Sequence, residues 1–172
     1  MLVVVLILAL MAAVTIPTFK GRFGASYEDA LIQELQSLAA AITAYQQDVG
    51  KYPPDINYLS ALPASPLDGC ATHNLTASQI AKYRGPYISR TISATQTSYV
   101  FGNKDTIQTV FDFPDSTAAP NGGYTHWLGI QVKGPDQTTV QNIDLKVDGV
   151  SNQNNGIIRY VFQAGLGQDY LL

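Results

Sequence analysis

The chain begins with an apolar segment, MLVVVLILALMAAVTI, in which no residue is charged and Thr15 is the only polar one. Its sixteen residues are fewer than the roughly 20 that a helix needs to cross a bilayer. A secretory signal peptide would place basic residues before the apolar stretch and a small-residue cleavage site after it. This segment has no such basic residues and only an imperfect site at Ala13 and Thr15. The pattern favours an apolar helix that the protein keeps.

Residues that weaken helices follow this segment directly. Pro17 removes one backbone hydrogen bond and crowds the preceding turn, and Gly21 and Gly24 each weaken a helix by about 1 kcal/mol relative to alanine. We expect the helix to be kinked or opened between Thr15 and Gly24.

A second helical pattern covers residues 26–49. Its apolar residues recur at spacings of four, three, four and three, which is typical of one buried helical stripe: Leu31, Leu35, Leu38, Ile42 and Tyr45. Ser26 is a good N-cap, and Glu28 and Asp29 would lie in the first turn, where the helix dipole favours acids. Gly50 and the two prolines at 53–54 predict the end of the helix.

The second half of the chain has the pattern of an antiparallel sheet. Residues 50–95 are loop-like, with a short helical turn near 77–82. Alternating and aromatic-rich segments then predict strands at 97–101, 109–113, 125–132, 157–163 and 168–172. We expect turns at 103–105 and 120–123 and a short helix at 139–147. The strands would form a meander whose apolar face rests on the stripe of the long helix.

These patterns define the fold class as α+β, a long kinked N-terminal helix packed on a small antiparallel β-sheet. The predicted organisation is an apolar helical segment at 1–24 followed by a globular domain at 25–172. Within that domain we expect a helix at 26–49, a loop region at 50–95 and the sheet at 96–172.

Composition narrows the functional classes. Charged residues make up 13% of the chain against about 25% in ordinary soluble domains, the net charge is −3, and Lys and Arg form no cluster. A protein that binds nucleic acid by neutralising phosphates is therefore disfavoured. Cys70 is the only cysteine, so no intrachain disulfide can form. His73 and His126 are far apart in sequence, and no nucleophile, phosphate-loop or dinucleotide motif is present, so we expect no catalytic residues and no enzyme.

Several separated motifs resemble those of type IV pilins and type II secretion pseudopilins. Residues 1–5, MLVVV, are similar to the stretch that follows the glutamate of that family, and Ile16-Pro17 matches its helix-breaking proline. Residues 45–54, YQQDVGKYPP, resemble the family's Y-x-x-D-x-G-x-Y-P junction, and residues 83–87, YRGPY, resemble its G-P-Y stretch. These motifs appear in the family's order over about the first half of the chain. Residues 144–159 also resemble a segment near the C-terminus of many prepilin-type proteins.

The resemblance implies a structural subunit of a helical filament. The apolar helix would hold the subunit in the bacterial inner membrane and then pack among identical helices in the filament core, giving a homo-oligomer built by pilus or secretion assembly machinery. The implied assembly positions are Met1, Val4, Leu8, Met11, Pro17, Gly21 and Gly24. The family's basic leader, processing site and glutamate would precede Met1, and five more residues would lengthen the apolar run to about 21, enough to cross a membrane.

Two functional alternatives remain open. One is a pseudopilin that drives protein export from a short periplasmic filament, whereas a pilus would be extracellular. The other is a membrane-anchored adhesive or lectin-like domain, which would tolerate loss of Pro17 and of the two glycines.

Two further sites are predicted with an ordinary structural alternative beside each. Oxygens of Asp148, Ser151, Asn152 and Asn154 could surround one Ca²⁺, as major pseudopilins carry a calcium loop near the C-terminus. The same segment holds a single carboxylate, and its Asn-Gly pair is typical of a simple turn. Asn74-Leu75-Thr76 has the N-x-[ST] pattern of a glycosylation acceptor, which is also common by chance. Calcium is the only cofactor that the sequence suggests.

Overall fold

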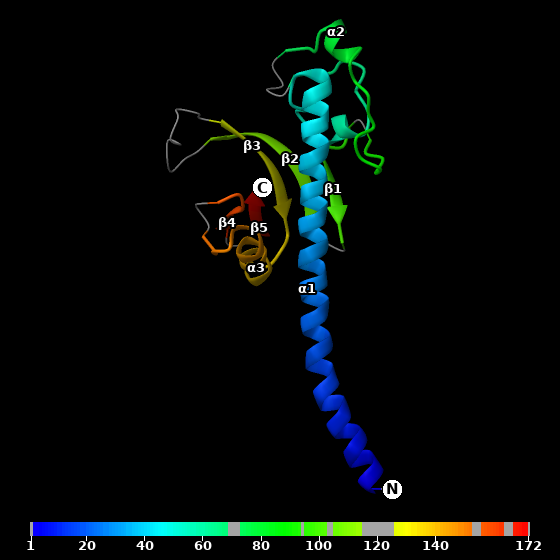
Figure 1. The fold of residues 1–172 in the computed structure, drawn as a ribbon, viewed down its shortest axis with the longest axis vertical. Coiled ribbons are helices and arrows are strands. Elements are labelled where there is room, and N and C mark those ends of the chain that lie inside the picture. The colour runs from blue at the N-terminus through cyan, green and yellow to red at the C-terminus, as the bar shows by residue number, and fades with distance from the viewer. Residues whose placement is uncertain are drawn as a thin grey trace.

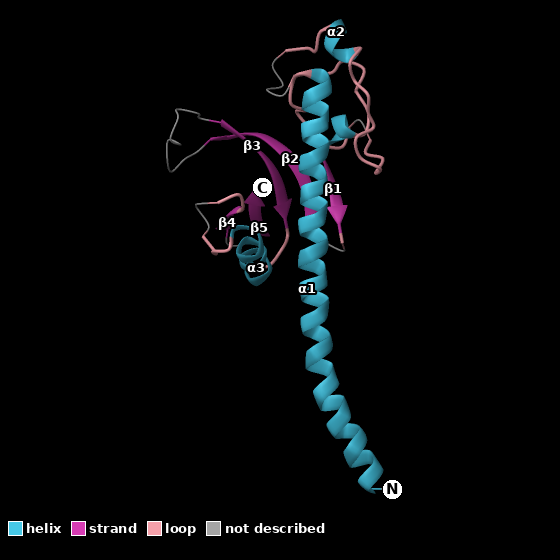
Figure 2. Cartoon of the chain, viewed as in Figure 1, coloured by secondary structure: helices cyan, strands magenta, loops and turns pink. Residues whose placement is uncertain are grey.

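The computed structural model describes residues 2–68, 73–93, 95–102, 105–114, 126–152, 156–163 and 167–171. A long N-terminal helix and an antiparallel sheet give the α+β fold class that the sequence predicts (Figures 1 and 2). Three helical elements accompany them: a 3₁₀ turn, η1 (Ile56–Leu59), and the helices α2 (Ala77–Ile80) and α3 (Gln137–Asp148).

The first helix, α1 (Leu2–Val49), is one uninterrupted element of 48 residues, about 70 Å long at 1.5 Å per residue. The backbone of α1 is helical from Thr15 to Gly24, so the helix is not opened there. α1 bends in its N-terminal part (Figure 1), and a kink at this segment stays a prediction. Ser26 is therefore an interior residue and not an N-cap. One missing hydrogen bond and two glycines cost a few kcal/mol, which long helical stretches on both sides outweigh.

The C-terminal end of α1 lies where the sequence predicts it. Gly50 has a φ of +78°, a left-handed conformation that glycine adopts without strain. Its N–H donates to the carbonyl of Gln46 at 2.8 Å, which satisfies one of the last helical acceptors. The chain then turns away at Pro53 and Pro54.

The sheet has five strands in the order β1-β2-β3-β5-β4, and every neighbouring pair is antiparallel. The strands are β1 (Ser98–Phe101), β2 (Asp105–Pro114), β3 (His126–Lys133), β4 (Arg159–Gln163) and β5 (Gly167–Leu171). All five predicted strands are present, β2 starting four residues earlier than expected. The predicted turn at 120–123 lies outside the described residues, as do positions 103 and 104 of the other.

The strand order differs from the predicted meander. α3 lies between β3 and β4 in sequence, so the chain leaves the sheet after β3 and returns with a β4–β5 hairpin. The second strand of that hairpin, β5, pairs with β3, and β4 becomes an edge strand. A meander would require direct β3–β4 pairing, which the excursion through α3 replaces.

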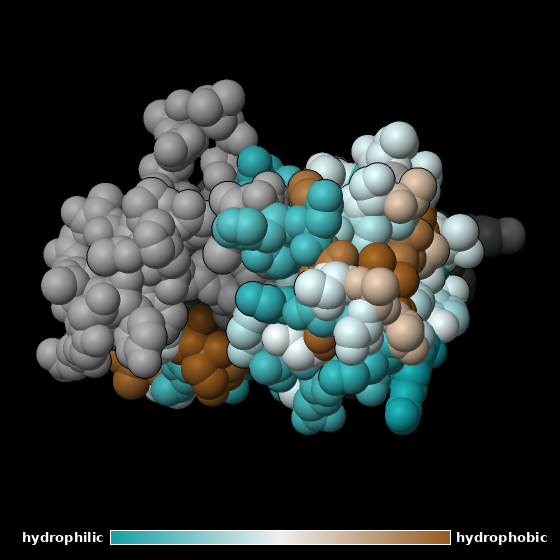
Figure 3. Space-filling view, turned by 90° about the horizontal axis from the view of Figure 1, so that it is seen from above, coloured by the Kyte–Doolittle hydropathy of each residue, from teal (hydrophilic) through white to brown (hydrophobic). Residues whose placement is uncertain are grey.

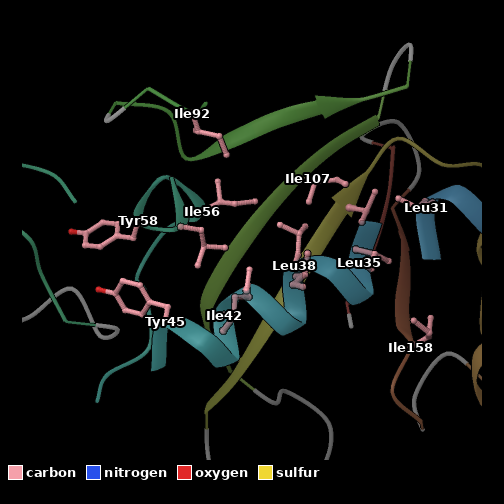
Figure 4. Close-up of a cluster of buried hydrophobic side chains, with 14 of the residues drawn as sticks. Leu31, Leu35, Leu38, Ile42, Tyr45, Ile56, Tyr58, Ile92, Ile107 and Ile158 are labelled. Carbon is pink, nitrogen blue, oxygen red and sulfur yellow. The ribbon is translucent and has the colours of Figure 1, made fainter. Parts of the chain in front are cut away.

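The stripe of α1 forms the centre of the hydrophobic core, as predicted. All five of its residues are buried, and they share one cluster with side chains from the sheet and from α3 (Figure 4). The partners from those elements include Ile107, Ile130, Val132, Val140 and Ile143, and Ile158 joins them from just before β4. The burial of these apolar side chains holds α1, α3 and the sheet in one unit.

Leu35→Ala should lower the free energy of unfolding by about 2–5 kcal/mol, because it removes a fully buried side chain and leaves a cavity in the core. The neighbouring exposed residue provides the control, since Gln36→Ala should change stability by less than about 0.5 kcal/mol. Urea denaturation of both variants measures the difference. Equal stabilities would contradict the central place of the stripe in the core.

Candidate assembly helix and its attachment to the globular domain

The two halves of α1 have different surroundings. Residues 26–49 run along the sheet, α3 and the loops, whereas the N-terminal half extends beyond the other described helices and strands (Figure 1). Most of the predicted assembly positions lie on this extending half, on helical backbone: Val4, Leu8, Met11, Pro17, Gly21 and Gly24. Met1 lies outside the described residues. The structure thus collects these positions on one segment that leaves the domain as a helix.

Polar side chains join α1 to α3 near the point where α1 leaves the domain. Asn142 Nδ2 donates to Glu28 Oε1 at 2.8 Å. Lys146 Nζ lies 2.8 Å from Glu28 Oε2 and 2.7 Å from Asp29 Oδ1. Hydrogen bonds to Asp29 and Glu28 raise the pKa of the Lys146 ammonium. We call these four residues the α1–α3 contact, which fixes α3 beside the exit of α1.

Sequence reasoning assigned the wrong role to the two acids of this contact. Glu28 and Asp29 were expected to interact with the dipole of a helix starting at Ser26, but no helix starts there. Glu28 is buried, and a buried carboxylate needs a hydrogen-bonding or charged partner. Its place on the edge of the apolar stripe was the available signal for a tertiary partner, although nothing in the sequence identified Lys146.

A second polar contact joins α1 to the start of β2. The Tyr27 hydroxyl donates to Asp105 Oδ2. Asp105 is buried, and its Oδ1 has no hydrogen-bond partner among the described residues. Burial, together with the nearby charge of Asp136, raises the pKa of Asp105 to about 6. This carboxyl group therefore changes charge near pH 6 rather than near pH 4.

A third contact holds the middle of α1 against β1. The Tyr99 hydroxyl donates to Glu34 Oε1. The Arg90 guanidinium lies 4.3 Å from the centroid of the Tyr99 ring, and its Nη2 is 3.7 Å from Glu34 Oε1. Burial, followed by the interactions with Glu34, raises the pKa of the Tyr99 hydroxyl, so it remains a donor.

Two of the sequence motifs meet at the C-terminal end of α1. Tyr45 packs edge-to-face against Tyr58, Tyr83 and Tyr87, with ring centroids at 6.5, 6.1 and 5.7 Å, a favourable arrangement for aromatic pairs. The Tyr87 hydroxyl donates to Asp48 Oδ2 at 2.9 Å. The Y-x-x-D residues of the first motif thus contact the tyrosines of the second. The sequence predicted each motif but not this contact.

The glycine of the second motif has a packing reason. Tyr83 folds back over Gly85, so that a Cβ at position 85 would overlap the Tyr83 ring and hydroxyl. Tyr83 cannot move aside freely because its ring is packed against Tyr87, with centroids 5.3 Å apart. A glycine at 85 therefore permits the aromatic cluster to close.

The predicted calcium residues are only partly brought together. Asp148 Oδ2 accepts a hydrogen bond from the backbone N–H of Ile158 at 2.9 Å. Ser151 and Asn152 follow α3 in an exposed loop, and Asn154 lies outside the described residues. Within the described part of the chain, no group of three or more His, Cys, Asp or Glu side chains is placed to hold a metal ion. Calcium binding stays a prediction.

A carboxyl group that the calcium prediction did not include lies beside this loop. Asp144 is fully buried on α3 and accepts a hydrogen bond from the N–H of Asn152 at 2.6 Å. Burial first, and the neighbouring Asp148 to a lesser degree, raise the pKa of Asp144. Asp144 and Asp148 therefore tie the chain after α3 to the helix through backbone N–H groups.

The predicted glycosylation acceptor lies on an exposed segment. Asn74 is exposed and pairs with Leu67 in an isolated β-bridge, while Leu75 beside it is buried. Thr76 caps α2, its hydroxyl oxygen accepting the N–H of Gln79 at 3.3 Å. The acceptor pattern thus coincides with a structural N-cap, and modification stays a prediction.

No helix within the described residues has the length and apolarity needed to cross a membrane. Comparisons with protein-family models, with curated proteins and with solved structures find no match to this chain.

Asp105→Asn should remove a pH-dependent loss of stability. Because the folded-state pKa is raised, the folded protein binds more protons than the unfolded chain between about pH 4 and pH 6, so stability falls as pH rises through this range. The rise in the pKa of Asp105 from 3.8 to about 6 corresponds to about 3 kcal/mol. The stability of Asp105→Asn minus that of wild type should therefore grow by up to about 3 kcal/mol between pH 4 and pH 7.

Urea denaturation at several pH values tests this, and parallel curves for the two proteins would contradict it. Tyr27→Phe provides a control, because it should keep the fall in stability with pH and move it, whereas Asp105→Asn should remove it. It removes the hydroxyl that donates to the Asp105 carboxylate, so the fall in stability should move to higher pH.

Proposed function

We propose that this protein is a structural subunit of a type IV pilus-like helical filament, which assembles through the N-terminal half of α1. One observation carries the proposal: a single continuous helix has its C-terminal half in the core of the globular domain, while the other half extends away from it (Figure 1). By sequence that extending half includes sixteen residues without a charge.

Apolar burial supplies the driving force for assembly. Each large aliphatic side chain gains about 1.5–3 kcal/mol on leaving water, and the extending half of α1 lies beyond the other described helices and strands (Figure 1). Lipid would cover it before assembly and copies of the same helix afterwards. Parallel packing of such helices would form the filament core, with the sheets outside.

The attachment of α1 to the domain suits a subunit that carries load. Three contacts join α1 to separate parts of the domain along its length: the α1–α3 contact, the Tyr27–Asp105 pair and the packing of Tyr45 against neighbouring tyrosines. A pull on the extending half would therefore be distributed over several elements. A flexible linker between anchor and domain would give no such distribution.

A pseudopilin of type II secretion is the second candidate. The contact between Asp48 and Tyr87 favours it, because it joins the two motifs that resemble pseudopilin-like chains. Both candidates need the same helix packing and differ in where the filament lies. Labelling intact cells with an antibody against the globular domain distinguishes them, since only an extracellular pilus is accessible.

Leu8→Asp should abolish filament formation, because a carboxylate in a water-free helix interface costs several kcal/mol, and each 1.4 kcal/mol corresponds to about tenfold in an association constant. Gln33→Asp, on the exposed face of the domain half of α1, is the matched control and should assemble normally. Negative-stain electron microscopy counts the filaments that each variant forms. Thermal melting checks that the globular domain is folded in both variants. Monodisperse wild-type particles would instead favour a single membrane-anchored adhesive domain.

A further inference from the structure

Among the residues whose exposure the structure describes, the most exposed large hydrophobic side chains lie in two separate places. Leu145, Val150 and Ile157 are 54%, 67% and 62% exposed, and Val100 is 58% exposed. On the face drawn in Figure 3, hydrophobic residues gather in separate small groups among hydrophilic ones. Small apolar groups gain importance where a larger contact already joins two molecules.

Three of these residues lie near the C-terminal end of α3. Leu145 lies on the last turn of α3, where its carbonyl accepts the N–H of Gly149, and Val150 follows at once. The segment that carries Ile157 is held against the same end of the helix, because Asp148 accepts the N–H of Ile158 at 2.9 Å. We call Leu145, Val150 and Ile157 the α3 patch. It adjoins β4, one edge of the sheet.

The fourth residue lies at the opposite edge of the sheet. β1 and β4 are the two edge strands in the order β1-β2-β3-β5-β4. Tyr99 and Phe101 pack against the core, so Val100 between them faces outward by the alternation of a strand. β1 and α3 lie on opposite sides of α1 (Figure 1).

We propose that the α3 patch of one copy packs against the β1 edge at Val100 of the next copy. This inference rests on the proposed filament, because α1 helices side by side would bring the two flanks of neighbouring copies together. Two different surfaces joined head to tail generate an open helical array rather than a closed pair. The weakly charged surface, with 13% charged residues and a net charge of −3, opposes such close packing little.

The small size of both surfaces agrees with a contact between neighbouring copies in a filament. A stable interface buries about 800 Å² on each partner, far more than three aliphatic side chains and one valine provide. The contact therefore forms only between copies that their α1 helices already hold together.

Crosslinking of mixed single-cysteine variants tests the pairing. In a Cys70→Ser background, Val100→Cys and Val150→Cys subunits are assembled together and treated with a short flexible bis-maleimide. The proposal predicts a dimer containing one subunit of each kind, and none from either variant alone. Ile80→Cys is the matched control: it is an exposed hydrophobic position on α2, and mixed with Val100→Cys it should give no dimer.

The outcomes separate this inference from the filament proposal. Filaments that give no mixed dimer, or that give dimers from Val150→Cys alone, overturn the head-to-tail pairing and leave the filament proposal standing. Absence of filaments from the wild-type chain overturns both. Triple replacement of the α3 patch by serine provides a second test, since it should shorten filaments without lowering the melting temperature, and filaments of normal length would count against the patch.

Discussion

The structure depends on one constraint, that the core helix of the domain and the extending segment are the same uninterrupted helix. The buried stripe of α1 fixes how the helix is rotated and placed against the sheet. Because the backbone stays helical from Leu2 to Val49, the packing of the stripe also sets the direction in which the N-terminal half leaves the domain. The position of the proposed assembly surface is therefore a consequence of how the core is packed.

Acidic side chains along α1 fix how far the helix is rotated and shifted relative to the rest of the domain. Glu28, Glu34 and Asp48 lie beside the apolar stripe, and each bonds to a different part of the domain: α3, β1 and the loop that contains Tyr87. A carboxylate removed from water is costly without a partner. Sliding or rotating α1 would separate all three acids from their partners at once, so the contacts penalise alternative positions of the helix more than they add to stability.

The parts of the fold that repeat a simple period could be predicted from the sequence. The stripe from Leu31 to Tyr45, the end of α1 at Gly50, the helix α3 and the positions of the strands follow from local patterns. The sequence predicted one long helix that is kinked or opened near Pro17, and the structure keeps the backbone helical there, because the cost of a proline is finite and is shared by a long helix.

Strand order and polar partners depend on contacts between residues far apart in the chain. The return of the chain through α3 decides that β5 lies beside β3, and no local pattern reveals it. In the same way, the sequence marks Glu28 as an acid at the edge of an apolar stripe but gives no indication of Lys146, 118 positions later. The motifs around Tyr45 and Tyr87 could be found separately, whereas their meeting at Asp48 is visible only in the structure.

A helical reconstruction by electron cryo-microscopy of the assembled full-length chain tests the central claim most directly. The account predicts a core of parallel α1 helices whose N-terminal halves pack at the 8–10 Å interaxial distances of close-packed helices, with the sheets outside. Particles that remain single, or filaments whose N-terminal halves lie at the periphery and touch no neighbouring copy, would contradict it.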